Sequence, residues 1–178
     1  GFLPDEGIFN KDQESTNFWF KLWPWEDMAA DEPELIDLLT ETARKRTSVF
    51  INPAYTLMFQ SKGIMKVLYD LYPDSPYLLA TDFQPLEGVK QVSKPMFGRE
   101  GANISILDES GDVADSTDGP YDIHPMVYQE YSELASDSEG RAYQAGVFFA
   151  WEACGLGFRR GPKILNDTAT FVPHVIRN

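Results

Sequence analysis

Alternating hydrophobic and polar positions predict a series of short strands along the chain. Aromatic and polar residues alternate from Phe18 until Pro24, which ends or kinks the segment. Residues 48–53 form a second short apolar segment that also ends at a proline. Further strands are expected at 89–97, 102–108, 124–134 and 141–151, with the glycine-rich residues 155–161 at a sheet edge.

Two segments carry the helical spacing of apolar residues. The first is 33–46, with a proline at a first-turn position. Its basic triplet, 44–46, suits the negative end of the helix dipole, which favours a helix-end role over an anion site. The second helix is expected at 62–72, with Ser61 as its N-cap. Because strands outnumber helices, we expect an α+β fold with a mainly antiparallel sheet and flanking helices.

Composition limits the kinds of protein that this chain can form. With 43% hydrophobic residues over 178 positions, the chain can bury a core, and we expect one domain over residues 1–178. Its formal net charge of −13 disfavours a nucleic-acid partner, because the surface would repel phosphates. No apolar run is long enough to span a membrane. The single cysteine, Cys154, lies near aromatic residues, which predicts a buried thiol and a reducing, cytoplasmic setting.

The segment KPMFGREG, residues 94–101, places much charge in an expected turn between two strands. It lacks the order GxxxxGK[ST] of a P-loop, and a strand follows it where a dinucleotide fingerprint needs a helix. Glycines in such a turn let backbone N–H groups approach an anion, and Lys94 and Arg99 add positive charge. The segment therefore fits a phosphate-covering flap. A plain surface hairpin with an Arg99–Glu100 pair is the simpler interpretation from composition alone.

Several segments, in the same order, resemble the glutathionylspermidine synthase family of ATP-grasp ligases. The resemblance lies in FKLWPWEDM, INPAYTLMFQSKGIMKVLYDLYPDSPYLL, KPMFGREGAN, VYQEY, WEACGLGFR and FVPHVI. These segments are spread over the chain from roughly residue 18 to residue 176. The resemblance implies the C-terminal portion of an ATP-grasp synthetase, with a glycine-rich hairpin as its flap.

The same resemblance implies a reaction and a set of site residues. Family members use ATP and Mg²⁺ to activate a carboxylate as an acyl phosphate, from which an amine then displaces phosphate. The substrates would be a carboxylate and an amine, such as a peptide and a polyamine. Arg159 is expected to hold the transferred phosphate, as the catalytic residue. The expected nucleotide contacts are Lys62, Lys94, Gly98, Arg99, Glu100, Gly101, Gln129, Glu130 and Tyr131.

Some of these residues also suit purely structural positions. Lys62 would fit a helix surface, and Glu130 would fit an exposed strand position. Arg159 could pair with one of the many carboxylates, and its neighbour Arg160 could be mistaken for it. Convergence of Lys62, Lys94 and Arg159 on one pocket would favour the nucleotide site.

The chain also departs from the family pattern. The magnesium-binding segments of the family, of the types Arg-Phe-Asp and Glu-x-Asn, have no counterpart in this sequence. We therefore expect the metal ligands outside this chain, in an N-terminal half of the same protein, and an isolated chain that is inactive. The acidic residues 108–122 suit a solvated hairpin, with a metal site as the less favoured alternative. The alternative function is a non-catalytic nucleotide-binding module or an acidic interaction module.

Overall fold

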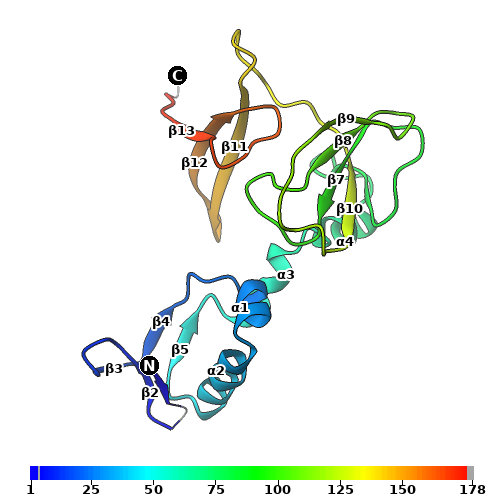
Figure 1. The fold of residues 1–178 in the computed structure, drawn as a ribbon. Coiled ribbons are helices and arrows are strands. Elements are labelled where there is room, and N and C mark those ends of the chain that lie inside the picture. The colour runs from blue at the N-terminus through cyan, green and yellow to red at the C-terminus, as the bar shows by residue number, and fades with distance from the viewer. Residues whose placement is uncertain (4, 176–178) are drawn as a thin grey trace. The chain divides into compact units, whose positions relative to one another are not determined.

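The chain is divided into two compact units, residues 1–61 and residues 62–178. A computed structural model describes residues 1–3 and 5–175 (Figure 1). The first unit contains β1 (Phe2–Leu3), β2 (Gly7–Phe9), β3 (Ser15–Thr16), β4 (Phe18–Phe20), α1 (Trp25–Asp31), α2 (Pro33–Lys45), β5 (Val49–Ile51), η1 (Ala54–Thr56) and α3 (Leu57–Gln60). The second contains α4 (Ile64–Leu71), β6 (Thr81–Asp82), β7 (Gln91–Pro95), β8 (Ser105–Leu107), β9 (Val113–Ser116), β10 (Met126–Glu130), β11 (Ala142–Ala150), β12 (Glu152–Gly161) and β13 (Thr170–Val172).

The first unit is built around a crossover between two parallel strands. β4 pairs with β5, and α1 and α2 lie between them in the sequence. The buried side chains of Trp25, Met28 and Leu39 form the core of this unit. Trp19 of β4 and Phe50 of β5 pack against that core from the sheet. A helical crossover is the usual way to join neighbouring parallel strands, so the connection follows the standard chain geometry.

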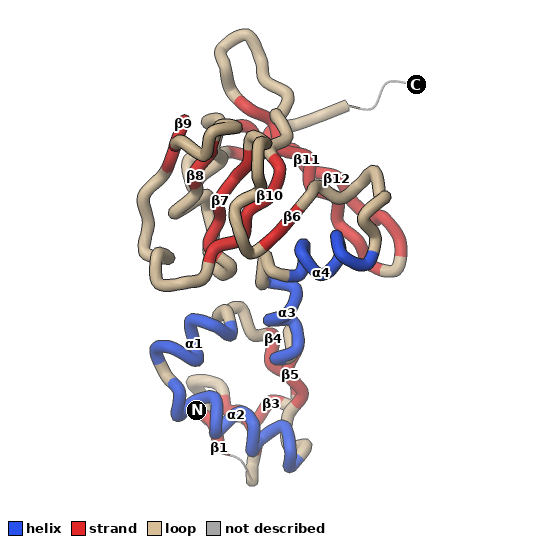
Figure 2. The backbone as a smooth tube through the Cα atoms, turned by 90° about the vertical axis from the view of Figure 1, so that its right-hand side faces the viewer, coloured by secondary structure: helices blue, strands red, loops and turns tan. Residues whose placement is uncertain are grey.

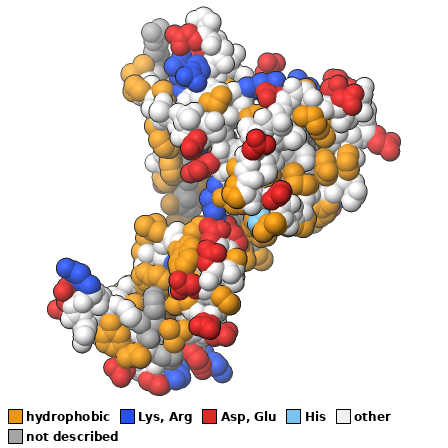
Figure 3. Space-filling model, viewed as in Figure 1, with side chains coloured by type: hydrophobic (Ala, Val, Ile, Leu, Met, Phe, Trp, Pro, Cys, Tyr) orange, Lys and Arg blue, Asp and Glu red, His pale blue; other side chains and the backbone are white. Residues whose placement is uncertain are grey.

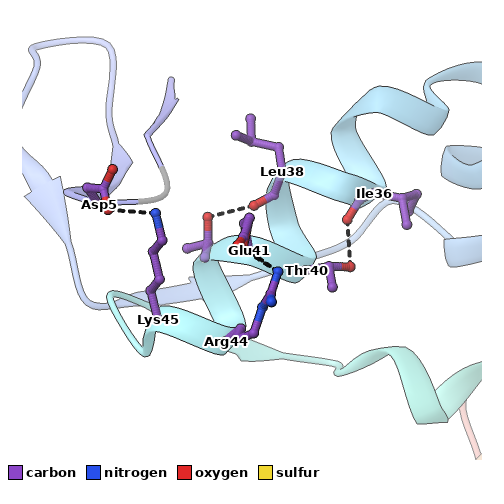
Figure 4. A network of polar contacts seen from close by, with 8 residues as sticks. Asp5, Ile36, Leu38, Thr40, Glu41, Arg44 and Lys45 are labelled. Atoms are coloured by element: carbon purple, nitrogen blue, oxygen red, sulfur yellow. Dashed lines mark hydrogen bonds and ion pairs between the residues drawn. The ribbon is translucent and has the colours of Figure 1, made fainter.

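The end of α2 confirms the role expected for its basic residues. Arg44 pairs with Glu41 at 2.6 Å, and Lys45 reaches Asp5 at 2.6 Å (Figure 4). Arg46 follows the helix in a left-handed conformation, with φ of 58°. The triplet therefore closes the helix and ties it to the N-terminal segment.

The second unit holds two antiparallel sheets. The five-stranded sheet has the order β6-β10-β7-β8-β9 (Figure 2), and the three-stranded sheet has the order β11-β12-β13 (Figure 1). Helix α4 contacts β6. The expected combination of helices with mostly antiparallel sheets is thus confirmed, and the parallel β4–β5 pair is the departure from it. The acidic residues 108–122 include the hairpin that returns from β8 to β9, as expected.

Three expectations about the helices need correction. Pro24 was expected to end or kink a strand. It is also the N-cap residue of α1, which begins directly after it at Trp25. Residues 57–60 form α3, which the sequence analysis missed. Ser61 ends α3, and Gly63 is the N-cap of α4, so Lys62 precedes the helix. The backbone N–H of Lys62 donates to Met96 O at 2.8 Å, which holds this residue outside the helix.

Two expectations about the C-terminal strands were also wrong. Cys154 is exposed, because the β11–β12 hairpin leaves both of its faces uncovered around this residue. β12 lies between β11 and β13, and residues 158–160 pair on both sides, so the expected sheet edge is wrong for these three residues, whereas residues 155–157 pair with β11 alone. No helix in the described part of the chain has the length and apolar character needed to cross a membrane.

Candidate functional site

The pairing of β7 with β10 brings Lys94 and Gln129 together. Lys94 lies opposite Val127, so Gln129 is its diagonal neighbour on the same face of the sheet. The Lys94 Nζ donates to Gln129 Oε1 at 2.7 Å. Gln129 Nε2 in turn donates to Thr81 Oγ1 at 3.0 Å, and Thr81 is only 1% exposed. The buried hydroxyl therefore fixes the amide so that its oxygen faces the ammonium group.

Lys62 approaches the same end of β7 from the segment before α4. Its Nζ donates to Gly98 O in the charged turn, at 2.7 Å. Burial lowers the pKa of Lys94, and the positive charge of Lys62 lowers that pKa further. The two lysines therefore repel one another at this end of β7, and an anion bound beside Lys94 would favour its charged form.

The charged turn is longer and better anchored than a tight hairpin. The connection between β7 and β8 runs from residue 96 to residue 104 and has positive φ at Glu100, Gly101 and Asn103. Thr117 Oγ1 donates to Gly101 O, and the N–H of Tyr121 donates to Asn103 Oδ1 at 2.8 Å. A plain two-residue hairpin is therefore excluded. Gly98, Arg99 and Gly101 are partly buried, whereas Glu100 is exposed.

The segment after β12 packs against this turn. A Cβ placed on Gly101 would lie 2.2 Å from Leu165 O, closer than any side chain tolerates. Glycine is needed here for its positive φ of 69° and for this close backbone approach. The packing brings residues 164–165 against the turn, although they lie more than sixty positions further along the chain.

Tyr131 lies at the far end of β10 between two lysines. Lys90 Nζ is 4.3 Å and Lys163 Nζ is 5.9 Å from the centre of the Tyr131 ring. Tyr131 and Lys163 also line a cavity of about 140 Å³, with Glu133, Leu134, Ser136, Gly140 and Ala142 as the other lining residues. The neighbouring residue Glu130 is exposed, and strand alternation directs it to the opposite face from Gln129.

The two arginines of β12 make different contacts. Arg159 Nη2 donates to Asn166 O at 3.0 Å and to Ala169 O at 3.4 Å, and so holds the loop that precedes β13. Arg160 pairs with Asp137 and with Glu139, each at 2.6 Å. The bond from the Arg141 N–H and the bond from Arg160 help to lower the pKa of Asp137 to about 2. Arg160 is therefore committed to an ion-pair network.

The structure brings together part of the predicted site. Lys62 bonds to Gly98 and Lys94 bonds to Gln129, and the charge of Lys62 acts on Lys94, so these four residues lie at one end of β7. Arg159 contacts backbone carbonyls in place of these residues, and the predicted convergence of all three cations is not seen. Sequence reasoning missed Thr81, Lys90 and Lys163, whose contacts depend on pairing between segments far apart in the chain. Among the described residues, no group of three or more His, Cys, Asp or Glu is placed to hold a metal ion.

Residues 1–177 match the family model described as glutathionylspermidine synthase preATP-grasp, and the chain belongs to this family. Among its relatives, an acid–amine ligase of Haemophilus influenzae is 32% identical over 166 residues. The trypanothione synthetase of Crithidia fasciculata is 27% identical over 144 residues, and the bifunctional glutathionylspermidine synthetase/amidase of Escherichia coli is 33% identical over 103 residues.

These matches cover most of this chain but a minor part of each relative. The alignment with the Haemophilus protein covers 87% of this chain and 40% of that protein. The corresponding shares are 79% and 22% for the Crithidia trypanothione synthetase, and 56% and 16% for the Escherichia protein. The relatives are named as ligases and synthetases, so the family is one of ligases.

Proposed function

We propose that this chain contributes the nucleotide-binding part of an ATP-dependent ligase that joins a carboxylate to an amine. The main support for this proposal is the pair of lysines at the end of β7. Lys62 donates to Gly98 O, and Lys94 donates to Gln129 Oε1. The acceptor of Lys94, Gln129 Oε1, is neutral, so an arriving phosphate would give the Lys94 ammonium a partner of full opposite charge. Neutralising the phosphates and positioning them is most of what a protein contributes to phosphoryl transfer.

The proposal assigns a role to each of the expected site residues. Lys94 and Lys62 bind phosphate oxygens, and Lys62 releases Gly98 O when it does so. The turn from Gly98 to Gly101, with Arg99 and Glu100, forms the flap of an ATP-grasp site. Gln129 orients Lys94 through their hydrogen bond, and the proposal assigns Tyr131 and the backbone at Glu130 to adenine binding.

The proposed ligase reaction has two steps, formation of an acyl phosphate and its conversion to an amide. A carboxylate oxygen attacks the γ-phosphorus of ATP, ADP leaves, and an acyl phosphate forms. The amine then attacks the carbonyl carbon, phosphate leaves, and an amide remains. Arg159 is assigned to the transferred phosphate, which requires it to leave the carbonyls of the 166–169 loop.

The remaining parts of the site are assigned to other segments of a longer protein. Mg²⁺ would help to neutralise the phosphate charge, and we place its carboxylate and amide ligands outside this chain. The names of the relatives suggest glutathione as the carboxylate substrate and spermidine as the amine. The single cysteine supports our proposal of a cytoplasmic enzyme. The relatives are more than twice as long as the aligned region, which agrees with a site completed by further segments.

Calorimetric titration of the chain with ATP and with ADP, in the presence of Mg²⁺, tests the proposal. We expect saturable binding that Lys94→Ala weakens at least tenfold, while Lys66→Ala leaves it unchanged. Lys66 is the matched control because it pairs with Asp70 on α4 at 2.6 Å. Circular dichroism of each variant checks that the fold is retained. Equal effects of the two substitutions would contradict the proposal.

A further inference from the structure

The first unit exposes one whole face of its parallel strand pair. Register places Phe18 opposite Val49 and Phe20 opposite Ile51, so these four side chains share a face. They are 64%, 54%, 57% and 45% exposed, respectively. On the opposite face, Trp19 and Phe50 pack against the helical core. We call the four exposed residues the β4–β5 face.

A bare apolar face is unusual for parallel strands. Parallel sheets occur almost always with both faces covered, because the crossovers that join their strands place helices against them. Here α1 and α2 supply one layer, and nothing in the described part of the first unit covers the other. Figure 3 shows hydrophobic side chains on the visible surface of this unit. Contiguous exposed apolar patches of this kind mark interaction sites.

We propose that the β4–β5 face is the docking surface for another segment of the same synthetase, which packs on the four exposed side chains and covers them. The proposal rests on the proposed function, in which a longer protein completes the site. The aligned region is 40% of the Haemophilus relative and 22% of the Crithidia trypanothione synthetase, so such proteins contain ample further chain.

The chemistry of the occupant follows from the face. Four aromatic and branched aliphatic side chains, without a charged group among them, require an apolar helix or strand surface as partner. An acidic or basic peptide would lose hydration there without gaining an ion pair. The occupant is therefore a segment with its own apolar stripe, as expected within one folded protein.

Hydroxyl-radical labelling of the full gene product and of the 178-residue chain, followed by mass spectrometry, tests the proposal. In the chain alone, Phe18 and Phe20 should be labelled faster than the partly buried Phe50, which serves as the internal control of the same residue type. In the full product, labelling of Phe18 and Phe20 should fall at least fivefold. Equal labelling in both proteins would overturn the proposal, including the case in which the gene product extends no further.

Two further measurements separate this proposal from its competitors. If a second copy of the chain covers the face, labelling of the chain alone will fall as its concentration rises, and this outcome would overturn the proposal. In the full product, Phe20→Glu should restore labelling at Phe18. Nucleotide titration of the chain alone tests the lysine pair separately, so loss of nucleotide binding and failure of the docking surface remain distinguishable.

Discussion

At the scale of single residues, Lys94 has a lowered pKa and is also the residue that we propose to bind phosphate. The pKa of Lys94 is lowered, first by burial and second by the charge of Lys62. The folded state therefore bears a cost at pH values below this lowered pKa. That cost disappears as the pH rises towards 10.5, because the folded protein loses the proton before the unfolded chain does. A bound phosphate would reverse the effect by favouring the charged form.

This pKa predicts how nucleotide binding depends on pH. ATP affinity should fall as the pH rises through the lowered pKa of Lys94, at a pH below that of an ordinary lysine. Lys94→Arg should flatten this dependence, because a guanidinium stays charged throughout the range. Calorimetry at several pH values between about 8 and 10 compares the two proteins. Identical pH profiles would show that Lys94 does not carry the charge that binds phosphate.

The residue scale also shows what the sequence can and cannot predict. The motif around Lys94 was informative because glycines and charges within one turn have few structural uses. The hydrogen bonds from Gln129 to Thr81 and from Lys94 to Gln129 could not be predicted, since each joins residues more than thirty positions apart. Cys154 was misplaced because aromatic neighbours in sequence suggested a core that its hairpin does not form.

At the scale of elements, the turn between β7 and β8 depends on glycine at position 101. Gly101 and Gly88 have nearly the same φ, 69° and 68°, but no atom lies within 4 Å of a Cβ built at Gly88. Gly88→Ala should therefore cost only the strain of a left-handed residue, about 1–2 kcal/mol. Gly101→Ala should cost about 1–3 kcal/mol more, because the methyl group meets Leu165 O.

Urea denaturation of both glycine variants measures this difference in the free energy of unfolding. We also expect Gly101→Ala to weaken ATP binding, since the turn must shift away from residues 164–165 to accept a methyl group. Gly88→Ala should bind ATP as the unchanged protein does. Equal destabilisation by the two substitutions would show that the close approach at Gly101 adds nothing.

The helices that were predicted correctly are those whose limits depend on residues nearby in the sequence. α2 carries a long apolar repeat, a proline at its first turn and a basic end, and it was predicted within a residue of its bounds. α1 and α3 have seven and four residues, too few for a periodic pattern to stand out. Ser61 looked like a cap, but a hydrogen bond to Met96 at the end of β7 decides where α4 begins. Long-range contacts thus overrode a local signal.

At the scale of the whole molecule, the proposed nucleotide contacts all lie in the second unit, residues 62–178. Addition of ATP should therefore slow amide hydrogen exchange in β7, β10 and the 96–104 turn. Exchange in β4 and β5 of the first unit should stay unchanged. Exchange measured by mass spectrometry with and without ATP compares these segments. Protection confined to the first unit would place the nucleotide elsewhere.

Composition alone would not have led to a ligase. A net charge of −13 and 43% hydrophobic residues describe many proteins, and they exclude more than they identify. The resemblance carried by the ordered segments identified the family, which the match over residues 1–177 confirms. The uncovered β4–β5 face could not be foreseen, because alternation predicts a strand but not which neighbours cover it.

A double-mutant cycle on the two lysines tests the central claim most directly. The affinities of ATP and of adenosine are measured by calorimetry for Lys62→Ala, Lys94→Ala, the double variant and the unchanged chain. We predict that each single substitution weakens ATP binding at least tenfold and leaves adenosine binding unchanged. The double variant should lose less than the sum of the two losses in binding free energy, because both lysines contact the same phosphates. Equal losses for ATP and adenosine, or no loss for either, would contradict a phosphate site at the end of β7.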